Sequence, residues 1–414
     1  MLKKPLNGYF MLKIFLFTLL LQISSMTAYA SWSLESRNYA LQYPESTFPN
    51  DHSFTVWAVA REKIKSLRPH IYSSVKSVRL KTHFSQKGYI NSSIHIQKRK
   101  KRKIKADLIY LLPGFFSNAT NSMNMLLLSI YAKQGYHVAT ASSSWSLDFL
   151  KKGPLFYPGD LITEAKLYNA LLPQIRKKIG SKYIKKIHLV GTSYSATLVP
   201  IMVNLDLDQH LTSSYQTTTM LGPVSNISYT YKFFDHWIKK LNEKTKCARV
   251  AKSLYRLLDF AFAKSSSDIS PLGHRCAKYL YFYHGFRKNF DKAIRKIHFS
   301  LGPQKSSPLY PMSRKQFRHW RRKKNYSSYL ENYSRIAQKL GKERMSLSYW
   351  IEKLEQKGYR QYRILTSYTD PLVDLEALKH PVFTDDNLII LKRGGHLAYR
   401  SLPWFQKFIK LSLK

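Results

Sequence analysis

Cysteine is scarce in this sequence, which has only Cys247 and Cys276 among 414 residues. Two cysteines 29 residues apart exclude a disulfide scaffold, and neither stands in a metal-ligand pattern. A single bridge between them in an oxidising compartment and two buried free thiols both stay open. The sequence shows no internal repeats, which excludes a repeat architecture.

Acidic residues are also few, with 24 Asp and Glu against 68 Lys and Arg and a formal net charge of +44. A surface this basic attracts anions such as lipid head groups, nucleic acid or an acidic cell envelope, and charge alone does not choose among them. Hydrophobic residues make up 44% of the chain. This is enough for a sizeable core and excludes a chain that is disordered throughout.

The first thirty residues have the features of an export signal. Lys3 and Lys4 form a basic start, residues 15–23 are apolar, and Ala28-Tyr29-Ala30 has the form of a cleavage site. The apolar run is shorter than the about 20 residues that a membrane-spanning helix needs. We therefore predict a cleaved signal peptide over 1–30 and a periplasmic or secreted protein, with an uncleaved N-terminal anchor as the alternative.

Residues 104–223 alternate between strand and helix patterns. Continuous apolar runs of strand length, typical of buried parallel strands, are separated by helical stretches, two of which end at glycine. This alternation predicts an α/β fold, a mostly parallel sheet with helices on both faces. The expected strands cover 104–112, 136–141, 184–190 and 218–221, and the expected helices cover 122–134, 161–179 and 193–204.

Three further regions surround this first part of the core. Residues 31–103 form an N-terminal extension that contains a β-hairpin, with strands over 75–84 and 89–97. Residues 224–360 have a helical, aromatic pattern with 31 Lys and Arg against 9 Asp and Glu. The sheet pattern then resumes over 361–414, so the sequence predicts one α/β domain interrupted by a basic helical insertion. In this last part we expect strands at 362–367 and 387–392 and a helix from Leu402.

The segment Gly191-Thr192-Ser193-Tyr194-Ser195 stands between an expected strand and an expected helix. A nucleophilic serine on a sharp strand-to-helix turn needs small residues two positions before and after it. Gly191 and Ser195 meet that requirement. Ser193 is therefore the predicted nucleophile.

Asp370 and His396 each follow a later expected strand. In open α/β sheets, sites form at the carboxyl ends of the strands. The chain order Ser, Asp, His then predicts a catalytic triad. His396 takes the proton of Ser193, and Asp370 orients the imidazole and stabilises its cation. Asp374, one helical turn beyond Asp370, is the alternative acid.

Gly114 and Phe115 belong to the loop 112–118, which follows the first core strand. Acyl transfer builds negative charge on the substrate oxygen, and backbone N–H groups that point at it stabilise that charge. We expect the N–H of Tyr194 and the N–H of Phe115 to form this oxyanion hole. Gly114 lets the backbone approach the serine closely.

Together these four segments resemble the α/β-hydrolase superfamily. The resemblance covers about 70–223 and 361–414. Ser195 stands where members usually have glycine, and Pro113 stands where many have histidine. The resemblance implies an α/β-hydrolase fold in which the insertion 224–360 is a cap over the active site. The fold hosts esterases, lipases, thioesterases and peptidases, so it does not name the substrate.

Combined, these patterns predict an exported serine hydrolase that cleaves a carboxylic ester through an acyl-enzyme, without a metal or cofactor. The expected partner is a small-molecule or lipid ester. Two alternatives stay open: a peptidase or amidase with the same triad, and a non-catalytic cationic module that binds the cell envelope. The aromatic residues of the insertion are expected to pack mostly among its helices, with a minority lining an acyl pocket.

Two basic stretches are candidates for contact with an anionic membrane or envelope surface. Residues 97–103 carry six Lys and Arg, and they form either a solvated hairpin tip or a contact to phospholipid or nucleic acid. Residues 321–324 in the insertion are all basic and follow Trp320. They suit a membrane surface or a solvated helix face. No specific nucleic-acid partner is expected.

Overall fold

The computed structural model describes residues 32–43, 74–210, 213–242, 288–300 and 343–412, together with 313, 315, 316, 319, 326 and 327. The predicted signal peptide, both cysteines and the basic stretch 321–324 lie outside these residues. None of the described helices is both long enough and apolar enough to span a bilayer.

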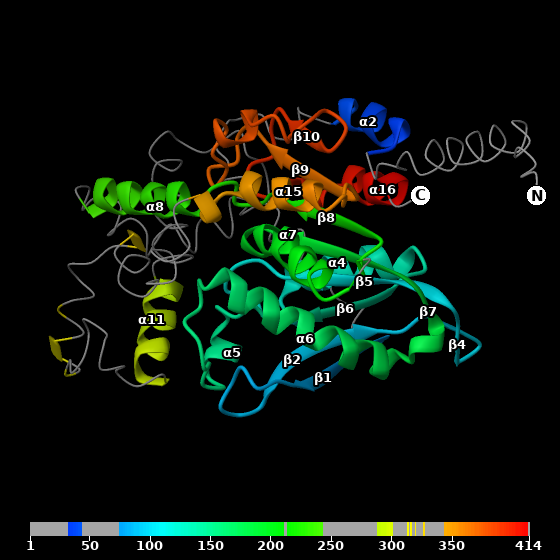
Figure 1. Ribbon diagram of the computed structural model, residues 1–414, viewed down its shortest axis with the longest axis horizontal. Helices are drawn as coiled ribbons and strands as arrows, with labels where there is room; N and C mark the ends of the chain where they lie inside the picture. The colour runs from blue at the N-terminus through cyan, green and yellow to red at the C-terminus, as the bar shows by residue number, and fades with distance from the viewer. Residues whose placement is uncertain are drawn as a thin grey trace, which may run out of the picture.

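Eight strands form one sheet in the order β1-β2-β6-β5-β7-β8-β9-β10 (Figure 1). β2 pairs antiparallel with β1 and with β6, whereas all the pairs from β6 to β10 are parallel. The predicted mostly parallel sheet is therefore confirmed. The strands are β1 Val75–Lys81, β2 Tyr89–His95, β5 Ala106–Leu112, β6 His137–Ala141, β7 Ile184–Thr192, β8 Thr217–Leu221, β9 Tyr362–Ser367 and β10 Leu388–Leu391; β3 Lys98–Arg99 and β4 Arg102–Lys103 form a separate hairpin.

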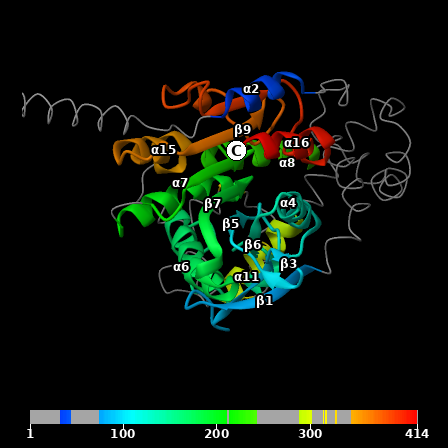
Figure 2. The ribbon, with the colours of Figure 1, turned by 90° about the vertical axis from the view of Figure 1, so that its right-hand side faces the viewer.

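Helices cover both faces of the sheet, which is why the apolar runs of its central strands are buried (Figure 2). One core lies between the sheet and helices α6, α7 and α15, and a second lies between the sheet and helices α4, α16 and α2. The helices are α2 Leu34–Leu41, α4 Ser122–Lys133, α5 Leu147–Leu150, α6 Leu161–Ile179, α7 Tyr194–Leu207, α8 Ile227–Asn242, α11 Lys288–Ser300, α15 Leu347–Gln356 and α16 Pro403–Ser412. Short 3-10 turns cover Ser181–Tyr183, Glu343–Met345, Ala377–Lys379 and Ala398–Ser401.

The predicted insertion contributes three of the described helices. α8 and α11 lie beyond one edge of the sheet, at the left in Figure 1. α15 instead packs on α7: its Ile351 and Leu354 side chains are fully buried, and the Asn204 side-chain amide of α7 donates to the Trp350 carbonyl at 3.1 Å. The end of the predicted insertion therefore includes a helix that covers the sheet.

Residues 32–43 dock on the last two strands of the sheet, which the sequence did not predict. The Trp32 side chain is 1% exposed, and its indole N–H is shared between the carbonyls of Ile364 (3.2 Å) and Asn387 (3.1 Å). Its ring lies 5.0 Å from the ring of Phe408 on α16. This short segment is thus fastened to the far end of the chain by one large buried side chain.

Trp32→Ala should therefore lower the free energy of unfolding by roughly 3 kcal/mol, since it removes a buried aromatic side chain and its shared hydrogen bond. Urea unfolding measures the change. The matched control is Leu34→Ala in the same segment, because Leu34 is 73% exposed and should change stability by less than about 0.5 kcal/mol. Equal effects of the two substitutions would contradict the docking of this segment.

Candidate active site

Ser193 occupies a sharp turn between β7 and α7. Its φ of 57° and ψ of −130° place it in a left-handed region that costs a non-glycine residue on the order of 1–3 kcal/mol. The Ser193 N–H donates to the Leu221 carbonyl at the end of β8 (2.8 Å), which anchors the turn to the neighbouring strand. The strand, the helix and this bond together hold Ser193 in its strained conformation.

Gly191 and Ser195, two positions before and after Ser193, are small for separate reasons. A Cβ on Gly191 would lie 2.5 Å from Val199 Cγ2 and 2.6 Å from Ala196 Cα, so a side chain has no room there. Ser195 is buried, and its hydroxyl donates to the carbonyl of Pro113. Serine in place of glycine thus adds a bond between α7 and the loop that follows β5.

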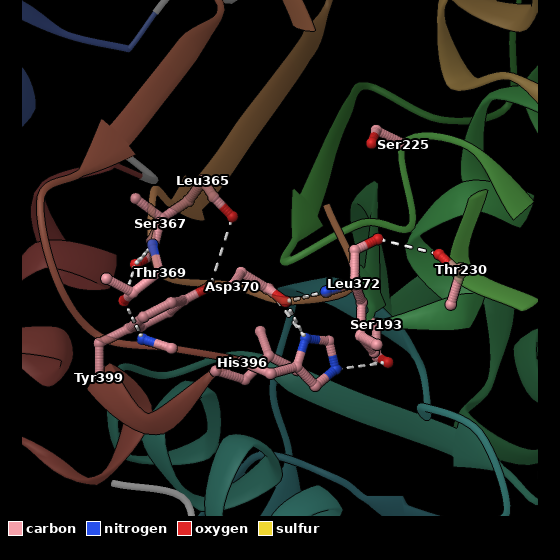
Figure 3. A network of polar contacts seen from close by, with 12 residues as sticks. Ser193, Ser225, Thr230, Leu365, Ser367, Thr369, Asp370, Leu372, His396 and Tyr399 are labelled. Carbon is pink, nitrogen blue, oxygen red and sulfur yellow. Dashed lines mark hydrogen bonds and ion pairs between the residues drawn. The ribbon is translucent and has the colours of Figure 1, made fainter. Parts of the chain in front are cut away.

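His396 and Asp370 complete a hydrogen-bonded chain with Ser193 (Figure 3). Ser193 Oγ lies 2.7 Å from His396 Nε2, and His396 Nδ1 lies 2.8 Å from Asp370 Oδ2 and 3.1 Å from Asp370 Oδ1. With its proton on Nδ1, the imidazole donates to the carboxylate and Nε2 accepts from the serine hydroxyl. All three residues are buried, so little bulk water competes for these bonds.

The loops that carry the acid and the base are tied to each other. The Gly395 N–H donates to Thr369 Oγ1 at 3.0 Å, which joins the loop after β10 to the loop after β9. Asp370 Oδ1 also accepts from the Leu372 N–H at 2.9 Å. The carboxylate is therefore oriented by the backbone as well as by His396.

Asp374 occupies a different position from Asp370. Its backbone N–H donates to Ser225 Oγ at 2.7 Å, and its carbonyl accepts from the same hydroxyl at 3.1 Å. In the described residues it is the carboxylate of Asp370 that contacts His396. Geometry thus favours Asp370 over Asp374 as the acid.

The loop after β5 lies directly against the serine. A Cβ on Gly114 would come within 3.1 Å of Ser193 Cβ, so the absence of a side chain allows this close approach. The rings of Phe115 and Tyr194 meet edge to face with centroids 5.0 Å apart. Phe115 follows Gly114 in this loop and Tyr194 follows Ser193, so both residues with a predicted oxyanion donor adjoin the serine. Tyr194 is also the first residue of α7, where the helix dipole is positive. Their role in stabilising an oxyanion stays a prediction.

Comparison with known proteins gives matches among solved structures only. No protein-family model and no curated protein matches the sequence. The chain is similar to an acylaminoacyl peptidase of Pyrococcus horikoshii (12% identity, TM-score 0.40), an esterase of Pyrococcus furiosus (10%, 0.43) and Est1E of Butyrivibrio proteoclasticus (12%, 0.41). The alignments cover 81%, 82% and 81% of this chain and 41%, 91% and 96% of the three proteins.

The chain thus spans about two fifths of the acylaminoacyl peptidase. Likeness at this level carries no activity or substrate over to this protein. The chain's own geometry is more informative: a mostly parallel sheet, a strained serine between strand and helix, and an acid and a base after later strands. The chain has the α/β-hydrolase fold.

The hydrolase fold here contains a buried carboxyl group that the sequence analysis missed. Glu164 on α6 is fully buried and accepts from Ser144 Oγ (2.6 Å), from the Gly159 N–H (3.0 Å) and from the Tyr194 hydroxyl (2.6 Å). Tyr194 directly follows Ser193 in the chain, so Glu164 contacts the residue next to the predicted nucleophile. A signal existed, because Glu164 interrupts the apolar face that α6 forms with residues 161, 165, 168 and 172.

Aromatic side chains of the insertion pack over this region of the fold. Phe290 of α11 stacks on Trp145 with ring centroids 5.7 Å apart, and it lies 4.1 Å from the ring of Tyr326. Trp145 in turn lies 4.6 Å from the ring of Phe115. The insertion therefore reaches the predicted oxyanion loop through a layer of rings. Among the described residues, no cluster of His, Cys, Asp or Glu is suited to hold a metal ion.

Burial raises the pKa of the Glu164 carboxyl from 4.5 to about 7, against the opposing effect of its three hydrogen-bond donors. A raised pKa in the folded state means that folding favours the protonated form. Stability should therefore fall as the pH rises from 4.5 to about 7 and then level off, by about 3 kcal/mol in total. Glu164→Gln should remove this part of the pH dependence.

The measurement is urea unfolding of both proteins between pH 4.5 and pH 8. The stability difference between Glu164→Gln and the unmodified chain should shift with pH in favour of the variant. Glu376→Gln is the matched control, since the Glu376 side chain is 78% exposed and pairs with Lys379 at the surface. A stability difference for Glu164→Gln that stays constant with pH would show that this carboxyl does not titrate in the window.

Proposed function

We propose that this chain is a serine hydrolase that cleaves a carboxylic ester through an acyl-enzyme intermediate. One observation carries the proposal: Ser193, His396 and Asp370 form an unbroken hydrogen-bonded chain that starts at a strained turn. A serine is a weak nucleophile unless a base removes its proton, and this arrangement supplies both the base and the group that orients it. Export stays a prediction from the N-terminal sequence.

In the first half of the reaction, Ser193 Oγ attacks the carbonyl carbon of the ester. Its proton passes to His396 Nε2, 2.7 Å away. The imidazolium that forms is stabilised by Asp370, whose carboxylate accepts from Nδ1–H. The charge on the substrate oxygen would be met by the N–H groups of Phe115 and Tyr194.

Collapse of the tetrahedral intermediate completes acylation. His396 gives its proton to the departing alkoxide oxygen, and the acyl group stays on Ser193. In the second half, His396 removes a proton from a water molecule that attacks the acyl carbon. The proton then returns to Ser193 Oγ as the acid is released, so the enzyme ends unchanged.

The same residues serve amide hydrolysis, in which His396 protonates a leaving amine. The activity assay should therefore include p-nitrophenyl esters and aminoacyl anilides side by side. Ester cleavage is the favoured activity because an ester carbonyl is less stabilised by resonance than an amide carbonyl and is attacked more readily. A purely binding role is disfavoured, since it does not require a buried, fully bonded triad.

Ser193→Ala should abolish covalent labelling by a fluorophosphonate probe and lower ester turnover by ~10⁴-fold or more, because it removes the attacking oxygen. Gel fluorescence and an ester assay measure the two effects. Ser181→Ala is the control, since Ser181 is exposed in the turn before β7, at the opposite end of that strand. Full labelling of Ser193→Ala would place the nucleophile elsewhere.

Asp370→Asn should lower kcat by ~10³–10⁴-fold, because asparagine favours the wrong tautomer of His396. Asp374→Asn should change kcat far less, since the bonds of Asp374 to Ser225 use its backbone. Steady-state ester hydrolysis by the two variants makes the comparison. The reverse ranking would transfer the acid role to Asp374.

A further inference from the structure

The edge of the sheet opposite the triad carries a cluster of basic side chains. At this amino edge the parallel strands begin, whereas Ser193, Asp370 and His396 follow their ends. Three exposed segments meet there: the β3–β4 hairpin, the end of α6 and the start of β7. We call this cluster the basic face, and it comprises residues 98–105 and 176–186. These two stretches hold 13 Lys and Arg and no Asp or Glu.

Specific contacts hold the segments of the basic face together. Lys103 Nζ donates to the Ile179 carbonyl at the end of α6 (2.8 Å) and lies 5.8 Å from the ring centroid of Tyr183. Lys182 Nζ lies 5.4 Å from the same ring. The acid beside these strands, Asp107, contacts His188 at 3.3 Å. The fold therefore brings the positive charges of two separate stretches of the chain close together.

The turn of the β3–β4 hairpin contains two residues that are unfavourable for its backbone conformation. Lys100 and Lys101 have φ of 47° and 65° in a two-residue turn, where Asn-Gly is strongly favoured. Two lysines at these positions cost conformational energy and also repel their basic neighbours. Backbone preference therefore does not explain them, whereas a contact with an anionic surface would offset both costs.

The N-terminal segment joins the folded body at the same edge. Trp32 binds the carbonyls of Ile364 and Asn387, near the beginnings of β9 and β10. The guanidinium of Arg363 lies 5.8 Å from the Trp32 ring. Trp32, where the described part of the chain begins, therefore lies at the edge that carries the basic face.

We propose that the basic face binds the surface of a bilayer that contains anionic phospholipid, with the triad edge turned away from it. Lipid is favoured over nucleic acid because Ile104, an apolar side chain beside the hairpin, is 37% exposed among the basic residues. β7 has nine residues and so separates the two edges by roughly 25–30 Å. Figure 2 looks onto this edge, and Figure 1 shows β4 and the helices α8 and α11 at opposite sides.

The test measures sedimentation of the full chain with vesicles of phosphatidylcholine and 30% phosphatidylglycerol at low salt. The test variant combines K98Q, R99Q, K100N and K101G. It removes four charges and installs the turn residues that the hairpin prefers, so the hairpin stays folded. Binding should weaken on the order of 100-fold, because each basic residue near an anionic surface contributes to partitioning.

The matched control removes four exposed charges from the described part of the insertion instead, by K292Q, R295Q, K296Q and K315Q. It should bind vesicles like the unmodified chain. Bound unmodified protein should hydrolyse a small soluble ester as fast as free protein, and ~1 M salt should release it. Hydrolysis is read separately from sedimentation, so a failure of the proposed activity does not affect the binding result.

Two results would overturn the proposal. Equal loss of vesicle binding in both variants would show that only total charge matters. Unchanged vesicle binding in the hairpin variant, with loss of salt-sensitive binding to duplex DNA, would assign the basic face to nucleic acid.

Discussion

The turn at Ser193 is the constraint on which the rest of the site depends. A serine at positive φ is strained. This backbone conformation is maintained because β7, α7 and the hydrogen bond to Leu221 hold the residue on both sides. The steric demand for glycine at position 191 and the bond from Ser195 to Pro113 follow from the same turn. In this conformation the Ser193 hydroxyl points toward His396, and the loop after β5 packs against the serine.

Parallel pairing then converts distant parts of the chain into one site. Ser193 and His396 are 203 residues apart in sequence, yet their side chains lie 2.7 Å apart. Strands that run in the same direction end at the same edge, so the loops after β7, β9 and β10 necessarily meet. The bond between Gly395 and Thr369 sets the final approach of two of these loops.

The two edges of the parallel sheet carry different kinds of side chain. The carboxyl edge holds the buried triad and Glu164, where low exposure strengthens hydrogen bonds and moves a carboxyl pKa toward neutrality. The amino edge holds exposed lysines and arginines, whose charge is screened by solvent. Because the strands connect these edges rigidly, a contact at one edge leaves the other open.

Much of this protein follows from local sequence patterns. Apolar runs predicted the parallel strands, and small residues around Ser193 predicted the turn, because both depend on residues adjacent in the chain. The order of Ser193, Asp370 and His396 predicted the chain of contacts, and the contact of the Asp370 carboxylate with His396 agrees with the choice of Asp370 over Asp374. The sequence analysis did not predict the roles of Trp32 and Glu164, and the physical reason is the same for both. Their roles come from neighbours hundreds or tens of residues away, and only the packed tertiary structure brings those neighbours together.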